Sequence, residues 1–164
     1  MNQKNRKTIY LLTGAPGSGK STFARINCCD NDVVVSRDKI RFSLIDNEKD
    51  YFKYENEVFD LFINEINLLL NSICVNNIWV DATHLTEKSR NKVLDKIELD
   101  KADIIVYNFL DGVEDCLQHN EQRNGLAKVP NSAIRRMSAQ YEPATHNEKH
   151  IYKEIRNIRN GVRI

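Results

Sequence analysis

The eight residues from Gly14 to Ser21, GAPGSGKS, restrict the possible folds of this chain more than any other segment. They match the pattern GxxxxGK[ST] at every fixed position. The apolar, partly β-branched run 8–13 before them is typical of a buried strand, and residues 20–27 after them are typical of a helix. A glycine-rich turn between a strand and a helix is therefore predicted, which indicates an α/β fold.

Such a turn is suited to binding the phosphates of a nucleotide. Its glycines let backbone N–H groups point inward around an anion, and the helix that follows adds the positive end of its dipole. We expect Lys20 to reach the β- and γ-phosphates of ATP and the Ser21 hydroxyl to ligate Mg²⁺. The predicted ATP-binding residues of this segment are Gly14, Ala15, Pro16, Gly17, Ser18, Gly19, Lys20, Ser21 and Thr22. A chance glycine-rich turn is the alternative, but pattern and context agree on nucleotide binding.

The rest of the chain alternates predicted strands with predicted helices. Further strands are expected at 33–35, 78–80 and 104–109, and helices at 51–74, 86–97, 113–122 and 131–141. Thr86 is a candidate N-cap, and the basic tail 149–164 is expected to be helical in its first part. Strands that alternate with helices favour a parallel sheet, here of about four strands, with helices on both faces.

Composition excludes little except a membrane protein. Lys and Arg number 24 against 23 Asp and Glu, so any nucleic-acid site must be a local patch. No apolar run approaches the ~20 residues of a membrane helix, and the first apolar run is too short for a secretory signal. The spacing of the cysteines favours reduced thiols in a cytoplasmic protein over a disulfide or a metal site. The cysteines are Cys28, Cys29, Cys74 and Cys116.

An acidic residue follows the second predicted strand, in the segment Ser36-Arg37-Asp38. Small kinases with this glycine-rich loop place an acid there, where it can accept a proton from the attacking hydroxyl. No NKxD segment typical of a GTPase occurs. Asp38 is therefore a candidate general base, although it could instead cap a helix or pair with Arg41 across a turn.

Three further blocks carry a resemblance to a known family. They are Asp38 with Arg41, then Val80-Asp81-Ala82-Thr83-His84-Leu85, and then the stretch from Asn120 to Gly125 with Val129, Pro130, Ile134 and Met137. Together with the glycine-rich loop, they resemble the kinase domain of phage and bacterial 5′-polynucleotide kinases. The similar blocks run from about residue 9 to residue 141.

The resemblance implies a P-loop kinase fold in a single domain over 1–164, with a mobile lid at about 119–130. It implies that Asp38 is the base on a 5′-hydroxyl and that Arg41 contacts the 3′-phosphate of the end nucleotide. It also implies that Thr83 holds the acceptor and that Arg123, on the lid, binds ATP and stabilises the γ-phosphoryl group during transfer.

Several residues keep an alternative interpretation. Arg41 could be a solvated surface charge, and Arg123 a helix C-terminal charge. Asp81 could act on Mg²⁺ through water or be a turn residue at a strand end. His84 stands where many members of the family have Asn, and His119 stands where some carry a second lid Arg. No DxDGT-like motif occurs before the chain ends at Ile164, so no phosphatase activity is expected.

The leading hypothesis is an ATP-dependent polynucleotide 5′-hydroxyl kinase that repairs DNA or RNA ends. A small-molecule kinase acting on a nucleoside, sugar, antibiotic or zeta-toxin-like acceptor is the alternative, and a nucleotide-binding regulatory module without transfer activity is a third. Tyr51, Phe52 and Tyr54 could stack an acceptor base, but core or helix-capping contacts are favoured for them.

Overall fold

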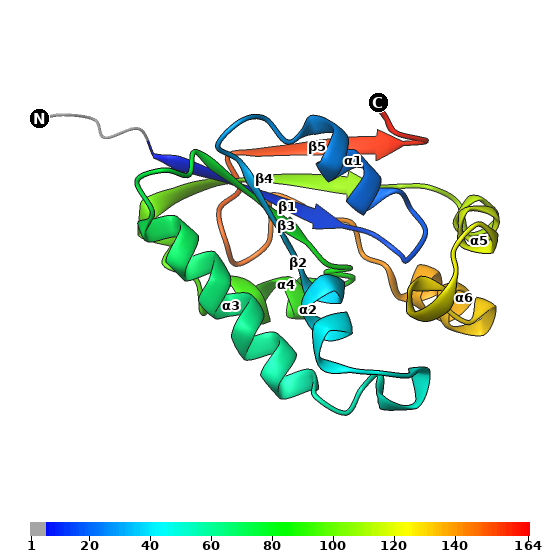
Figure 1. Ribbon diagram of the computed structural model, residues 1–164. Coiled ribbons are helices and arrows are strands. Elements are labelled where there is room, and N and C mark those ends of the chain that lie inside the picture. Colours follow the sequence, from blue (N-terminus) through cyan, green and yellow to red (C-terminus); the bar gives the residue numbers. More distant parts are fainter. Residues whose placement is uncertain (1–5) are drawn as a thin grey trace, which may run out of the picture.

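The computed structural model describes residues 6–164, which form a six-stranded sheet with helices on both faces (Figure 1). The strand order is β2-β3-β1-β4-β5-β6, in which β1 to β5 are parallel and β6 is antiparallel to β5. The strands are β1 (Lys7–Thr13), β2 (Val33–Ser36), β3 (Asn77–Asp81), β4 (Ala102–Phe109), β5 (Glu154–Arg159) and β6 (Val162–Arg163). The expected α/β class with a parallel sheet is confirmed.

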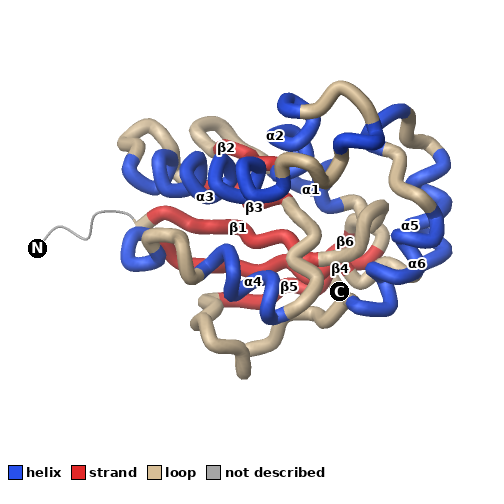
Figure 2. The backbone as a smooth tube through the Cα atoms, turned by 90° about the horizontal axis from the view of Figure 1, so that it is seen from below, coloured by secondary structure: helices blue, strands red, loops and turns tan. Residues whose placement is uncertain are grey.

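Helices cover both faces of the sheet and also lie beyond the carboxyl ends of its strands (Figure 1). The α-helices are α1 (Lys20–Asn27), α2 (Arg37–Leu44), α3 (Glu55–Asn71), α4 (Glu87–Leu94), α5 (Val113–Glu121) and α6 (Asn131–Gln140). α1 covers one face, and α3 and α4 cover the other (Figures 1 and 2). α5 and α6 lie beyond the carboxyl ends of the strands, where parallel α/β sheets bind ligands.

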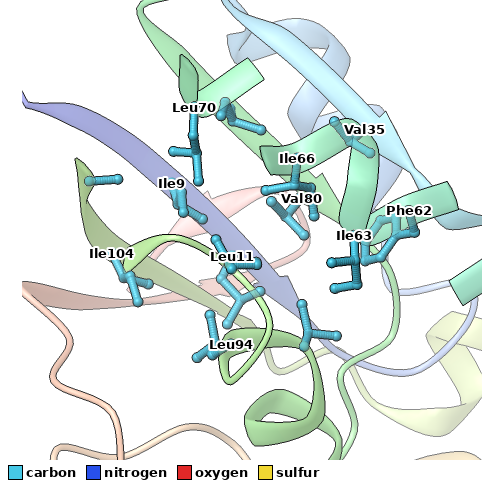
Figure 3. Packing of buried hydrophobic residues seen from close by; sticks show 14 of the residues in the cluster. Ile9, Leu11, Val35, Phe62, Ile63, Ile66, Leu70, Val80, Leu94 and Ile104 are labelled. Carbon is cyan, nitrogen blue, oxygen red and sulfur yellow. The ribbon is translucent and has the colours of Figure 1, made fainter. Parts of the chain in front are cut away.

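The alternation of side chains along β1 divides the core between the two faces. Ile9 and Leu11 point toward α3 and α4, where they pack with Phe62, Ile66 and other buried residues (Figure 3). Leu12 points to the opposite face and packs in the cluster that contains Ala24 of α1. Because both faces are covered, the central strands are almost continuously apolar, as the sequence analysis expects.

The expectations of about four strands and of a helical tail are wrong. Residues 154–159 form β5, which pairs with β4, and 162–163 form β6. Of the β5 side chains only Ile158 is fully buried, and the charged ones pair across the surface, as Glu154 does with Arg163 at 2.8 Å. A strand with one buried side chain has almost no apolar alternation, so its charges resemble a solvated helix face.

Two further boundaries differ from the expected pattern. The residues after β2 continue directly into α2, and Ser36 caps this helix by accepting from the backbone of Lys39 at 3.3 Å. The helix expected over 51–74 begins only at Glu55, so the segment before it is a turn after a short 3-10 helix, Glu48–Asp50. The predicted cap at Thr86 is confirmed, since its side chain accepts from the backbone of Ser89.

None of the helices over residues 6–164 combines the length and the apolar character needed to cross a membrane.

Candidate active site

The loop 14–21 joins the end of β1 to the start of α1. Gly17 and Gly19 have φ values of 84° and 87°, a conformation that favours glycine. The amide of Gly14 donates to the carbonyl of Thr83 at 2.8 Å, so the loop is anchored to the segment that follows β3. The sequence motif is thus positioned at the helix N-terminus, where a phosphate group can be bound.

Lys20 lies folded back under this loop. Its ammonium donates to the carbonyls of Gly14 and Ala15 at 2.9 and 2.8 Å, and its side chain is almost fully buried. Burial lowers its pKa to about 8, against the opposing effect of the nearby Asp81 carboxylate. The carbonyls hold the ammonium where an incoming phosphate can replace them as its partner.

Ser21 and Asp81 form the pair that can hold a metal ion. The Ser21 hydroxyl donates to Oδ2 of Asp81 at 2.6 Å, from the first turn of α1 to the end of β3. Burial raises the pKa of the Asp81 carboxyl, although Lys20 and the Ser21 hydroxyl act in the opposite direction. A hydroxyl and one carboxylate fit Mg²⁺, which keeps most of its waters and takes its other ligands from substrate phosphates. Over residues 6–164 no cluster of three or more metal-binding side chains exists, so a larger protein cage is not available there.

Asp38 lies in the first turn of α2, beside Arg41 one turn later. Its Oδ1 accepts from Nη1 of Arg41 and, at 3.4 Å, from the hydroxyl of Tyr51. No hydrogen bond within residues 6–164 uses its Oδ2, and its side chain is 60% exposed. Because Ser36 provides the cap, Asp38 is not the N-cap of this helix. One carboxylate oxygen is therefore fixed while the other can accept a proton.

Arg41 is buried, with 6% of its surface exposed, so the interpretation as a solvated surface charge is wrong. Its Nε donates to Oε1 of Glu55 at 2.8 Å, and its Nη1 donates to Asp38 and, at 3.3 Å, to Tyr51. Among the described residues no acceptor faces Nη2. A desolvated guanidinium with one unused donor edge is suited to binding an anion.

Thr83 and His84 connect this region to the phosphate loop. The Thr83 carbonyl accepts from Gly14, and Nδ1 of His84 donates to the carbonyl of Leu12 at 2.7 Å. Arg90 donates to the His84 carbonyl at 2.9 Å and forms a buried ion pair with Glu148. These hydrogen bonds thus fix the backbone of the segment that carries the half-exposed Thr83 side chain.

The predicted lid, residues 119–130, is closed on itself by Asn120. This buried side chain donates to the Val129 carbonyl at 2.7 Å and accepts from the Val129 amide at 3.0 Å. Arg123 lies within that closed segment, and its amide donates to the Asn120 carbonyl at 3.0 Å. Its positive charge lies close enough to influence the pKa values of both Lys20 and Asp81. Among the described residues its guanidinium has no acceptor.

Helix α5 lies directly against the phosphate loop. A Cβ atom at Gly17 would lie 2.4 Å from the Cys116 carbonyl oxygen, so only glycine fits there. Nδ1 of the exposed His119 donates to the Gly17 carbonyl at 2.8 Å. His119 therefore joins the start of the predicted lid to the phosphate loop.

The structure places the predicted site residues beyond the carboxyl ends of the strands, around the phosphate loop. Thr22 is exposed on α1 and makes no side-chain hydrogen bond with the described residues. Sequence reasoning missed Glu55 and Asn120 as partners of site residues. The only available signals were a carboxylate near the start of a predicted helix for Glu55 and, for Asn120, an amide within the predicted lid.

Comparisons with known proteins agree with this geometry. A family model described as an AAA domain matches residues 9–144, which include every residue of the site. No curated protein sequence matches the chain significantly. The solved structures of the Pnkp1/Rnl/Hen1 RNA repair complex include a chain with 29% identity and a TM-score of 0.68 over 85% of the present chain. The present chain spans 45% of that matched chain.

Two more distant structures share the fold alone. A fungal RNA kinase has 14% identity and a TM-score of 0.63, and the match covers 93% of this chain and 73% of that one. A gluconokinase from Sinorhizobium meliloti 1021 has 12% identity and a TM-score of 0.52, and the match covers 95% and 85% of the two chains. The fold is therefore shared by a protein described as an RNA kinase and by one described as a gluconokinase.

Proposed function

Because the chain belongs to the AAA domain family, and the matched region contains the complete site, we propose that it is an ATP-dependent polynucleotide 5′-hydroxyl kinase. The kinase-like P-loop fold makes it a nucleotide-binding phosphotransferase. The finer assignment is to a nucleic-acid end, DNA or RNA, as acceptor, and to an end-repair role in the cytoplasm. The resemblance to a chain of an RNA repair complex supports this choice.

One observation carries the proposal: the pair of Asp38 and Arg41 on the first two turns of α2. The carboxylate can accept the proton of a 5′-hydroxyl through Oδ2, while the buried guanidinium offers Nη2 to an anion beside it. A nucleotide at a 5′ end has this combination of groups, a 5′-hydroxyl and a 3′-phosphate. A sugar or nucleoside without phosphate would leave only Nη2 of Arg41 without a partner, since Glu55, Asp38 and Tyr51 accept from its other donors.

The residues then divide the reaction between them. Lys20 and Ser21 would hold the phosphates of ATP, and Ser21 and Asp81 would hold Mg²⁺, which neutralises phosphate charge when bound. Asp38 takes the proton as the 5′-oxygen forms its bond to the γ-phosphorus. The bond from that phosphorus to the bridging oxygen breaks, and ADP leaves with the electron pair. Arg123 would stabilise the charge that develops on the phosphoryl group.

The test is a comparison of acceptors with labelled ATP. Thymidine, thymidine 3′-monophosphate, gluconate and a 5′-hydroxyl oligonucleotide are offered to the wild type and to Arg41→Gln. We expect labelled oligonucleotide and labelled 3′-monophosphate, with thymidine about 10- to 100-fold poorer in kcat/KM, because a hydrogen bond to a charged group is worth about 1.5–3 kcal/mol. Arg41→Gln should lose most of this preference while its KM for ATP stays unchanged.

Two other results would replace the proposal. Equal or faster labelling of thymidine or gluconate would identify a small-molecule kinase. ATP binding without turnover on any acceptor would identify a regulatory module.

A further inference from the structure

Tyr51 and Phe52, in the turn before α3, carry two adjacent aromatic rings, and the first of these contacts Arg41. Tyr51 is half-buried, and its hydroxyl donates to Asp38 and accepts from Arg41. The Arg41 guanidinium lies over the Tyr51 ring, 4.6 Å from its centroid. Tyr51 therefore contacts both Asp38 and Arg41, the two residues that bind the end nucleotide in the proposed function.

The ring of Phe52 is 73% exposed beside Tyr51. The two ring centroids are 4.8 Å apart and the rings meet edge to face at 74°. By contrast, Phe59 and Phe62 on the helix that follows are buried in the core. The turn before α3 thus holds one phenylalanine out of the core, next to the site.

The location of Phe52 differs from that of two other exposed apolar side chains, Ile26 and Leu68. Ile26 lies in the last turn of α1, and Leu68 in the last turns of α3, both helices that return to the amino ends of the strands. The turn that holds Phe52 lies beyond the carboxyl ends of the strands, on the same side of the molecule as α5 and α6 (Figure 1).

We propose that Phe52 stacks against an unpaired nucleobase of the acceptor strand, close to its 5′ end. This inference rests on the proposed function. A strand with its hydroxyl at Asp38 and its first phosphate at Arg41 would lie beside Tyr51, which contacts both residues. The exposed ring of Phe52 adjoins the ring of Tyr51, so it is within reach of a base near that end.

The charges around Phe52 agree with stacking rather than phosphate binding. Lys49 and Lys53 flank it in the chain, but Glu48 and Asp50 balance them, and Lys53 lies within 4.0 Å of Asp50. Affinity gained at Phe52 should therefore depend little on salt, unlike affinity from contacts to phosphates. Stacking should also tolerate any base, since every base has a π-face.

The test measures KM for oligonucleotides with wild type, Phe52→Ala, Phe52→Trp and the control Leu68→Ala, which truncates an exposed apolar side chain away from the site. We expect Phe52→Ala to raise KM about 5- to 100-fold with little change in kcat, in KM for ATP or in the dependence of KM on salt. Phe52→Trp should restore KM, and Leu68→Ala should not change it. A series of acceptors with single abasic positions locates the base.

An abasic nucleotide at one of the first few positions should raise KM for the wild type and remove the difference between wild type and Phe52→Ala. An unchanged KM in Phe52→Ala would overturn the inference. An equal effect of Phe52→Ala on intact and on all abasic acceptors would do the same. If light scattering shows that Phe52→Ala changes only the oligomeric state, Phe52 binds a second copy of the chain instead. A wild type that labels no oligonucleotide would contradict the proposed function itself, which is a different outcome.

Discussion

His84 is a residue whose backbone and side chain both restrict what can replace it. Its φ is 42°, in the left-handed region that Asn tolerates better than most side chains. Its Nδ1 bonds to the Leu12 carbonyl, and its Nε2 is buried without a partner among the described residues. Burial lowers its pKa to about 4, so the ring is neutral and carries its proton on Nδ1. Asn at this position, as in similar kinases, would keep a donor in nearly the same place.

Replacement of His84 by Asn should make the protein less sensitive to mild acid. The pKa of His84 is about 4 in the folded chain and about 6.5 in the unfolded chain, so the unfolded chain binds more protons between these values. The free energy of unfolding therefore falls as the pH drops from 6.5 toward 4. By pH 5 the wild type should lose about 2 kcal/mol more than His84→Asn, relative to pH 7. Urea unfolding at both pH values measures this, and equal losses would contradict a neutral buried His84.

At the scale of elements, the closure of the lid by Asn120 determines where Arg123 is held. Asn120→Ala should lower kcat about 10- to 100-fold, because Arg123 would no longer be fixed over the transferring group. Steady-state kinetics at saturating ATP and acceptor measures the effect. Asn124→Ala is the matched control, since this exposed lid residue makes no side-chain hydrogen bond with the described residues.

A second background shows whether Asn120 acts through Arg123. In an Arg123→Ala protein, the further change Asn120→Ala should leave kcat nearly unchanged, because the group that it positions is already absent. A full additional loss would mean that Asn120 only stabilises the fold. An unchanged kcat in the single variant would mean that the lid does not need this closure.

The elements that could be predicted from the sequence are those with local signals. The motif 14–21 predicts both the loop and α1, and the Thr86 cap predicts the start of α4 to within one residue. β5 could not be predicted, because its stability comes from pairing with β4 rather than from an apolar pattern. The burial of Arg41 depends on Glu55, which lies 14 residues away in another helix, and no local pattern reports such a pairing.

The whole molecule gathers segments from across the chain at one edge of the sheet. β1 and the loop that follows it lie between β3 and β4. The chain passes from β1 to β2 through α1 on one face of the sheet, and from β3 to β4 through α4 on the opposite face (Figure 1). Such a reversal of strand order leaves a crevice at the carboxyl ends. Asp38 follows β2, Asp81 is the last residue of β3, and Arg123 follows β4, so the fold itself brings them together around the phosphate loop.

The central claim is that Asp38 activates a 5′-hydroxyl end for attack on ATP. The most direct measurement is the transfer of labelled γ-phosphate to a short 5′-hydroxyl oligonucleotide by wild type and by Asp38→Ala, with ATP binding measured for both. The account predicts transfer by the wild type and a loss of about 10²- to 10⁴-fold in Asp38→Ala. It predicts equal ATP binding, since the hydrogen bonds of the exposed Asp38 side chain go to Arg41 and Tyr51 and not to the phosphate loop. A wild type that binds ATP but leaves the oligonucleotide unlabelled, or an Asp38→Ala protein as active as wild type, would contradict it.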